Sequence, residues 1–300
     1  MPLTRTTKRG RARGPSSYPT TASRRWRTAG AVAVVVVFVP PLVLLVAGSL
    51  RQPGLPPPVG VELVPDPASA AGYRQAVGLG GLLRATLNSL LVAVVAVPVS
   101  VLVASLAGFA LTQLSRRLAT VVMAASLLAL MVPATALLAP RFLLFRSLEL
   151  TDTLVPLVAP ALLATSPLYP LVYYAAFRAL PADLYDACRL ADLTPVQVWW
   201  RVAMPLVRPV TAGLAALTFV LTWSNFLDPL VFVYDRSLFT LPLALRSLAT
   251  LDPTNFPVFL AGAVIATVPA LVVFGIAQRH FLHRYGLHRY GPLDPKGTHR

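Results

Sequence analysis

Six long runs without a charged side chain constrain this sequence most strongly. A helix needs about 20 predominantly apolar residues to cross the hydrocarbon core of a bilayer, and each run is about that long. The 300 residues are 56% hydrophobic and 12% charged, with a mean hydropathy of +0.69, whereas a soluble domain carries about 25% charged residues. The sequence therefore predicts an all-α membrane protein with six transmembrane helices, at 28–50, 85–115, 118–140, 153–177, 210–227 and 253–278.

Basic residues are concentrated in one set of the connections between these runs. The N-terminal tail, the Arg116–Arg117 turn, the 178–209 loop and the C-terminal tail together hold 19 of the 26 arginines and lysines. By the positive-inside rule, both termini and the 178–209 loop should be cytoplasmic. Membrane orientation also accounts for the net charge of +15. Because no aromatic side chains interleave with the basic ones, we expect no nucleic-acid partner.

The remaining segments are predicted as tails and one long loop. Residues 1–27 are basic and rich in Ser, Thr, Gly and Pro, so we expect a disordered cytoplasmic tail. The run at 28–50 is too long for a signal-peptide core, which favours an uncleaved first helix. Residues 51–81 are rich in proline and glycine and predict an irregular extracytoplasmic loop. Residues 281–300 predict a second basic cytoplasmic tail.

Proline also occurs inside the apolar runs. Each such residue removes a backbone donor and tends to kink its helix. Membrane bundles tolerate these breaks where neighbours or an aqueous cavity satisfy the freed carbonyl groups. The pattern is typical of a transporter and also of ordinary packing between membrane helices. The residues concerned are Pro98, Pro133, Pro156, Pro160, Pro167, Pro170 and Pro269.

The segment 180–209 is polar, yet it carries the signals of two short helices. Pro181 and Asp183 suit a first helical turn. The first helix should break near Asp192, because Thr194 can serve as the N-cap of a second helix, followed by proline and by a capping-box glutamine. The expected apolar sides are Leu184, Ala187, Cys188 and Ala191 in the first helix and Val196, Trp199, Trp200 and Ala203 in the second.

Two functions fit such a helix pair. It could lie on lipid headgroups, anchored by its two tryptophans. An interfacial helix usually carries Lys or Arg along its polar face, whereas Asp183, Asp186 and Asp192 stand among the arginines here. The aspartates favour a docking element for a protein partner.

At these residues the chain resembles the membrane subunits of bacterial ABC importers, the binding-protein-dependent inner-membrane permeases. Their signature loop runs E-A-A-x-x-D-G-A, then about nine residues, then I-x-L-P. Asp186-Ala187-Cys188 matches its start loosely and Val202-Ala203-Met204-Pro205 matches its end. The central aspartate–glycine falls on Ala191-Asp192 and the following alanine on Leu193. An aspartate therefore stands at the glycine elbow, where it tolerates unusual φ better than most residues.

The resemblance extends over roughly residues 29–285, with its core at 82–280. It is closest to the carbohydrate branch of the family, of maltose and glycerol-phosphate permease type. The matching pieces are Thr86-Leu87-Asn88-Ser89, Trp223-Ser224-Asn225-Phe226, Pro229-Leu230, Thr240-Leu241-Pro242-Leu243, Pro269 and Gln278-Arg279-x-Phe281.

The resemblance implies a type I ABC importer permease fold with a cytoplasmic coupling helix, in a bacterial inner membrane. It implies a second, non-identical permease subunit, two ATP-binding subunits and an extracytoplasmic solute-binding protein. This chain has no phosphate-binding G-x-x-x-x-G-K-[ST] motif, so ATP hydrolysis is expected on a partner and the chain is not expected to be an enzyme. The expected contacts with the ATPase are polar at Asp186, Arg189, Asp192, Thr194 and Arg201 and apolar at Ala187, Cys188 and Leu193.

Candidate contacts in the substrate pathway lie at the end of the fifth run. An aromatic face can stack on the C–H side of a sugar while Asn and Asp bond its hydroxyls, which makes Trp223, Asn225, Phe226 and Asp228 the residues to test. Helix packing and interfacial anchoring are the alternatives for Asn225 and Trp223. Asp228 is the most unusual, since a carboxylate at the end of a span is costly unless it is paired or hydrated.

Other functions remain open at this level. The solute could be a polyamine or a phosphate, and a self-sufficient secondary transporter or a membrane-embedded enzyme is an alternative. Ion-coupled transporters usually place ionisable residues inside their spans, which are nearly free of them here. Cys188 is the single cysteine, so no internal disulfide forms, and the histidines cluster in the C-terminal tail without a metal-ligand pattern. No cofactor is expected.

Overall fold

The computed structural model describes residues 21–55, 60, 62–78, 81–251 and 255–285. These residues are almost entirely helical, and among them the only β-type pairing is an isolated bridge between Arg51 and Ala68. The all-α prediction is therefore confirmed. Most of the predicted tail 1–27 and of the tail 281–300 lies outside the described residues.

The chain forms two compact units, Met1–Leu44 and Leu45–Arg300. The first contains most of helix α1 (Thr21–Ser49), which begins earlier than the predicted span. Valine, leucine and phenylalanine side chains of α1 between Val35 and Val46 are exposed, except for the half-buried Leu45, as expected for a helix surrounded by lipid.

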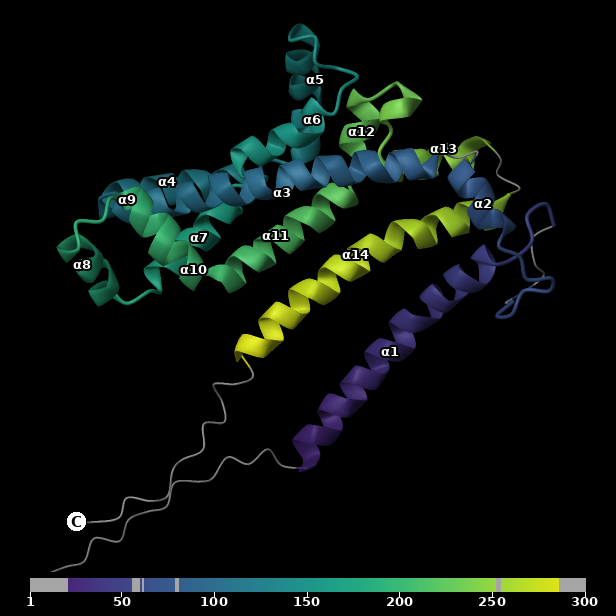
Figure 1. Ribbon diagram of the computed structural model, residues 1–300, viewed down its shortest axis with the longest axis horizontal. Coiled ribbons are helices and arrows are strands. Elements are labelled where there is room, and N and C mark those ends of the chain that lie inside the picture. Colours follow the sequence, from purple (N-terminus) through teal and green to yellow (C-terminus); the bar gives the residue numbers. More distant parts are fainter. Residues whose placement is uncertain (1–20, 56–59, 61, 79–80, 252–254, 286–300) are drawn as a thin grey trace, which may run out of the picture. The chain divides into compact units, whose positions relative to one another are not determined.

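The second unit is organised around α3 (Leu82–Gln113). Helices α7 (Leu168–Arg178) and α11 (Arg208–Trp223) pack along it, and α14 (Phe256–Tyr285) packs on α11 (Figure 1). Helix α13 (Leu241–Leu251) joins α3 to α14. The loop predicted as irregular contains a further helix, α2 (Ala71–Gly78), which packs on α3 and α14.

One predicted span, 118–140, is sharply bent, and a second sharp bend lies in the 180–209 loop, just before the predicted span 210–227. Helix α4 (Arg116–Ala129) meets the helical segment Ala134–Ser147, which contains η1 (Ala134–Leu137) and α5 (Leu138–Ser147), at 86°. The segment Pro195–Leu206 meets α11 at 83°. The fourth predicted span is divided into α6 (Val155–Val158), η2 (Ala159–Leu163) and α7, with Ala164 and Thr165 at φ of 60° and 62°.

The described helices account for fewer membrane spans than the six that were predicted. Among the described residues, three helices are long and apolar enough to cross a bilayer, or five if each bent pair is one span, and the apolar stretch Val35–Ser49 is shorter. Six spans therefore stays a prediction. Not every proline in an apolar run breaks its helix. Pro98 and Pro269 lie inside continuous helices, whereas Pro133 lies in the bend between α4 and α5.

Gly108 on α3 lies in close contact with the backbone of α7. A Cβ atom there would lie 2.5 Å from Tyr173 Cβ, 2.7 Å from Pro170 O and 2.9 Å from Tyr174 N. Because two of these atoms are backbone, α7 would have to move to admit even a methyl group. The glycine therefore sets the distance between α3 and α7.

Gly108→Ala is expected to destabilise the protein although alanine is the better helix former. Overpacking of this kind costs about 1–3 kcal/mol, more than the roughly 1 kcal/mol that helix propensity returns. Gly275→Ala in α14 is the matched control, because no atom lies within 4 Å of its added Cβ. Thermal unfolding in lipid nanodiscs should show a lower midpoint for Gly108→Ala alone; equal midpoints would contradict the close contact.

Candidate functional site

The 180–209 loop folds as the two helices and elbow that its sequence predicts. Helix α8 (Ala182–Leu190) is followed by a turn, in which Asp192 adopts the left-handed conformation at φ 51°. The second helix comprises α9 (Pro195–Gln197), the π-helical turn η3 (Val198–Ala203) and α10 (Met204–Leu206). The aspartate at the elbow therefore takes the backbone conformation that glycine would provide.

A complete capping box begins the second helix. The Thr194 amide donates to Gln197 Oε1 at 2.9 Å, and the Gln197 amide donates to Thr194 Oγ1 at 3.4 Å. The two bonds satisfy backbone donors that have no partner inside the helix. The predicted cap is confirmed.

Thr194→Ala is expected to loosen this helix start by about 1 kcal/mol, the usual loss for an N-cap. Thr194→Ser should retain the cap, since the serine hydroxyl accepts the same bond. Hydrogen–deuterium exchange of residues 195–203 checks both, with faster exchange expected only for the alanine. Equal exchange in the two variants would show that the cap does not hold the loop.

The inner face of α8 packs on the ends of the apolar helices. Cys188 is 6% exposed and belongs to a buried cluster with Phe109 of α3 and Phe177 of α7. The Tyr185 hydroxyl donates to Phe177 O at 3.0 Å. Burial, and secondarily the nearby Cys188, raises the pKa of Tyr185 above its ordinary value. The phenol therefore stays protonated and keeps its bond at neutral pH.

The outer face of α8 is a single stripe. Asp183, Asp186, Ala187 and Leu190 recur at i, i+3, i+4 and i+7 and are all exposed, Leu190 to 90%. The members of the predicted apolar stripe differ in exposure, since Cys188 is buried whereas Ala187 and Ala191 are exposed. Cys188 is buried within this chain, and its contact with a partner stays a prediction. Leu190 was missed, since its position falls on the polar side of the predicted stripe.

The second helix likewise exposes part of its predicted apolar side. Trp199 and Ala203 are 6% and 0% exposed, together with a buried Val198. Trp200 and Val196, which belong to the same predicted apolar side, are 64% and 66% exposed. The π-helical turn shifts the spacing of the residues that face inward. Arg201 is exposed, as are Asp192 and Thr194, and Leu193 is half-buried.

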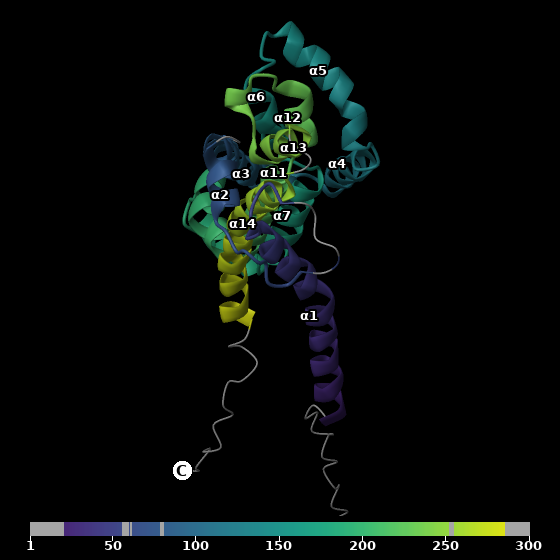
Figure 2. The same cartoon turned by 90° about the vertical axis from the view of Figure 1, so that its right-hand side faces the viewer.

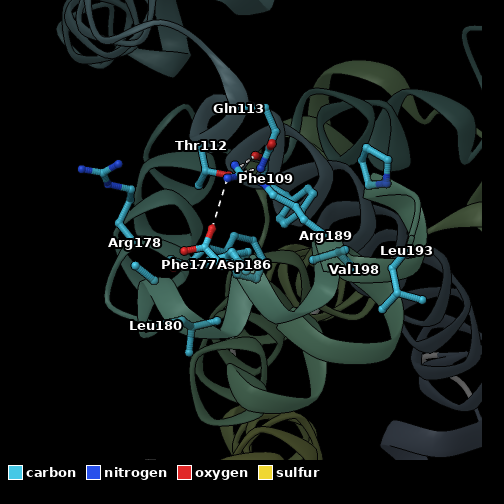
Figure 3. Close-up of a pocket in the computed structure, with 13 residues that line it drawn as sticks. Phe109, Thr112, Gln113, Phe177, Arg178, Leu180, Asp186, Arg189, Leu193 and Val198 are labelled. Carbon is cyan, nitrogen blue, oxygen red and sulfur yellow. Dashed lines mark hydrogen bonds and ion pairs between the residues drawn. The ribbon is translucent and has the colours of Figure 1, made fainter. Parts of the chain in front are cut away.

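A cavity of about 560 Å³ is lined by residues of α8 and of the ends of α3 and α7 (Figure 3). Phe109 and Phe177 line it and meet edge to face, with ring centroids 5.5 Å apart. Arg189 and Asp186 form an exposed ion pair at 3.2 Å on its rim. Such a pair on the surface contributes little to stability. A partner could therefore bind either charge at little cost to the fold.

The four predicted pathway residues do not form one cluster. Trp223 is 5% exposed, stacks on Phe219 at 5.5 Å and donates from Nε1 to Ala266 O at 2.9 Å. Its ring therefore joins α11 to α14. Phe226 is half-buried beneath the guanidinium of Arg246, which lies 5.4 Å from the ring centroid.

Asp228 is buried and paired with an arginine that sequence reasoning did not single out. It lies in the first turn of α12 (Leu227–Phe232) and is 8% exposed. Arg141 of α5 donates to both carboxylate oxygens, at 3.0 and 3.2 Å. Asn225 donates to Asp228 Oδ2 at 3.0 Å and accepts from the Asp228 amide at 3.2 Å. The expected partner of this carboxylate is therefore Arg141.

Metal ligands do not gather anywhere in the described part of the chain, where no three His, Cys, Asp or Glu residues are grouped. The side chains of the C-terminal histidines lie outside the described residues.

A bundle of apolar helices, some sharply bent and with a two-helix loop at the ends of α3 and α7, defines a multi-pass membrane protein. Residues 69–286 match the sequence profile of the binding-protein-dependent transport system inner membrane component, and the chain belongs to this family. The resemblance read from the loop is confirmed.

Relatives and solved structures agree with the family. The chain is 31% identical to the arabinooligosaccharides transport system permease protein AraQ of Halalkalibacterium halodurans over 254 residues, 84% of this chain and 90% of the relative. It is 30% identical to the lactose transport system permease protein LacG of Rhizobium radiobacter over 195 residues, 65% and 71% of the two chains. A chain of a bacterial ABC transporter that imports alginate has the same fold, with a TM-score of 0.71 at 18% identity, over 89% of this chain and 100% of that one.

Proposed function

We propose that this chain is the permease subunit of an ATP-driven importer for a sugar or sugar-like solute. It would form half of the translocation pathway in a bacterial inner membrane, with both termini cytoplasmic. The proposal is supported by the family and by relatives named for arabinooligosaccharides and lactose. A second, non-identical permease, two ATPase subunits and an extracytoplasmic solute-binding protein would complete the transporter.

The observation that carries the coupling role is the outward stripe of α8. Exposed aspartates beside a leucine that is 90% exposed provide charge and apolar area at one site, the composition of a protein contact rather than of a solvated loop. We propose that this stripe, with Arg189, Asp192, Thr194 and Arg201, contacts the ATPase. Cys188 and Leu193 would then support the loop from inside.

Movement of the docked loop would reach the pathway through packed side chains. Tyr185 and Cys188 connect α8 to Phe177 of α7, and Gly108 holds α7 tightly against α3. A displacement of α8 by the ATPase would therefore shift α7 and α3 together and change access to the pathway. Asn225 and Phe226, which are half-buried at the break after α11, are the proposed contacts for solute. Trp223 and Asp228 would position this break.

Uptake by the reconstituted transporter tests the proposal. Proteoliposomes with both permeases and the ATPase would be given ATP inside, the binding protein outside, and radiolabelled arabinooligosaccharide, lactose or trehalose. ATP-dependent accumulation of one sugar is expected. Accumulation of spermidine or phosphate instead would identify a non-sugar importer. Uptake driven by an ion gradient without ATP would identify a secondary transporter and overturn the proposal.

A further inference from the structure

Three helical segments lie beyond breaks in their spans and contact one another. Helix α5 follows the bend at 130–133, and α12 follows the break at 224–226. Helix α6 precedes the left-handed residues Ala164 and Thr165. Figures 1 and 2 show α5, α6 and α12 together on one side of α3, and α12 contacts both of the others. We call these three helices the cap.

The cap has an apolar core of its own. Its buried members include Phe145, Leu157 and Phe232, one from each helix, and only Val92 comes from α3. Phe232 packs against Phe145 and Phe142, with centroids 5.6 and 6.3 Å apart. The three helices therefore share an apolar core, to which α3 contributes through Val92 and on which α6 also packs, and three breaks in the chain connect the cap to the rest of the second unit.

Arg141 is the one side chain among the described residues that bonds all three segments. From α5 it donates to the Asp228 carboxylate of α12 at 3.0 and 3.2 Å and to the Pro156 carbonyl of α6 at 3.0 Å. Its guanidinium also lies 5.2 Å from the centroid of the Phe232 ring. Asn225 then closes the break before α12 through its two bonds with Asp228.

A second link joins the loops of the cap. Asp152, between α5 and α6, donates from its amide to Phe232 O at 2.8 Å. Its Oδ1 accepts from the amides of Tyr234 and Asp235 at 2.8 and 2.9 Å. Directed bonds thus reinforce the cap at both ends of α12, whereas its connections to α4, α7 and α11 are breaks that can act as hinges.

We propose that α5, α6 and α12 move as one rigid body during transport and that Arg141 is the positioning residue that keeps them together. Buried ion pairs specify an arrangement more than they stabilise it, because desolvation offsets much of their attraction. The Arg141–Asp228 pair would therefore define one geometry of the cap while the breaks absorb its motion. The inference rests on the proposed function, since the ATPase would drive this motion.

Distances between spin labels test the rigid body. In a Cys188→Ser background, Leu143 of α5 and Leu230 of α12 give a pair within the cap, and Leu143 with Val121 of α4 gives a pair across the bend; all three side chains are exposed. The assembled transporter would be measured without nucleotide and trapped with ATP and vanadate. The distance within the cap should stay constant, while the distance across the bend should shift by more than the width of its distribution.

A second set of variants tests whether Arg141 keeps the three helices of the cap together. Arg141→Met should broaden the distance within the cap and lower solute transported per ATP hydrolysed by about tenfold, the size of a typical coupling free energy. The charge reversal Arg141→Asp with Asp228→Arg should restore the narrow distance distribution and the solute transported per ATP if the ion pair holds the helices together. Arg146→Met, an exposed arginine on the same helix, should change neither.

The outcomes separate this inference from the proposed function. A distance within the cap that changes as much as the one across the bend overturns the rigid body, and so does no change in either while ATP is hydrolysed. If the complex neither assembles nor hydrolyses ATP, the proposed function fails instead. In that case, the comparison of wild type with Arg141→Met in nanodiscs still tests whether Arg141 positions the three helices. Identical distributions of the distance within the cap would refute that role.

Discussion

Arg141→Met is expected to lower the free energy of unfolding by about 3–5 kcal/mol, because it leaves a buried carboxylate without its cation. Asp228 is 8% exposed and, among the residues that the structure describes, retains only Asn225 as a side-chain donor once Arg141 is removed. Methionine preserves much of the apolar stem, so the loss reports the charge rather than a cavity. Thermal and denaturant unfolding in lipid nanodiscs measure it.

The double variant Arg141→Met with Asp228→Leu distinguishes an unpaired charge from a general loss of packing. Removing both members of a buried ion pair is often neutral, so the double variant should regain most of the stability that the single variant loses. Arg146→Met serves as the control on α5 and should resemble wild type. A double variant as unstable as the single one would show that the pair is not what stabilises this region.

Local hydrogen-bond chemistry made the 180–209 loop predictable. A capping box involves residues three apart, so Thr194 and Gln197 specify the helix start without reference to the rest of the chain. The elbow at Asp192 is also predictable from local geometry, because aspartate enters the left-handed region more readily than most residues.

Breaks inside apolar runs were much less predictable. Both arms of a bent span are apolar, so hydropathy gives no sign of the 86° turn between α4 and Ala134–Ser147. Proline is ambiguous as well, because Pro98 lies in a continuous helix whereas Pro133 lies in a bend. The difference depends on which neighbours satisfy the freed carbonyl groups, and this is a tertiary property.

The Arg141–Asp228 pair illustrates the same limit for polar residues. The sequence identifies Asp228 as a carboxylate that needs a partner, yet that partner lies 87 residues away. Arg141 directly follows an uncharged run and was counted with a connecting loop. Only the packing of α5 on α12 shows that this half-buried arginine is the partner of Asp228.

Leu190→Asp is expected to weaken binding of the ATPase by about 2–4 kcal/mol, roughly 30- to 1,000-fold in dissociation constant, as for a central residue of an interface. Leu190 is 90% exposed, so the substitution should leave the fold and the thermal midpoint unchanged. Leu193, which the sequence favoured for apolar contact, is half-buried within this chain, and a charge there would disturb the loop itself. Titration of the ATPase against the permease in nanodiscs measures the change.

Two variants make this prediction specific to the outer stripe of α8. Leu190→Met retains apolar area and should bind nearly as well as wild type. Leu206→Asp places the same charge on an exposed leucine of α10, in the same loop but outside the stripe, and should also bind. Leu190 is 90% and Leu206 47% exposed, so neither aspartate is placed in the core, and a loss of binding at Leu190 alone would indicate a partner that contacts α8. Undiminished binding by Leu190→Asp would remove α8 from the docking surface.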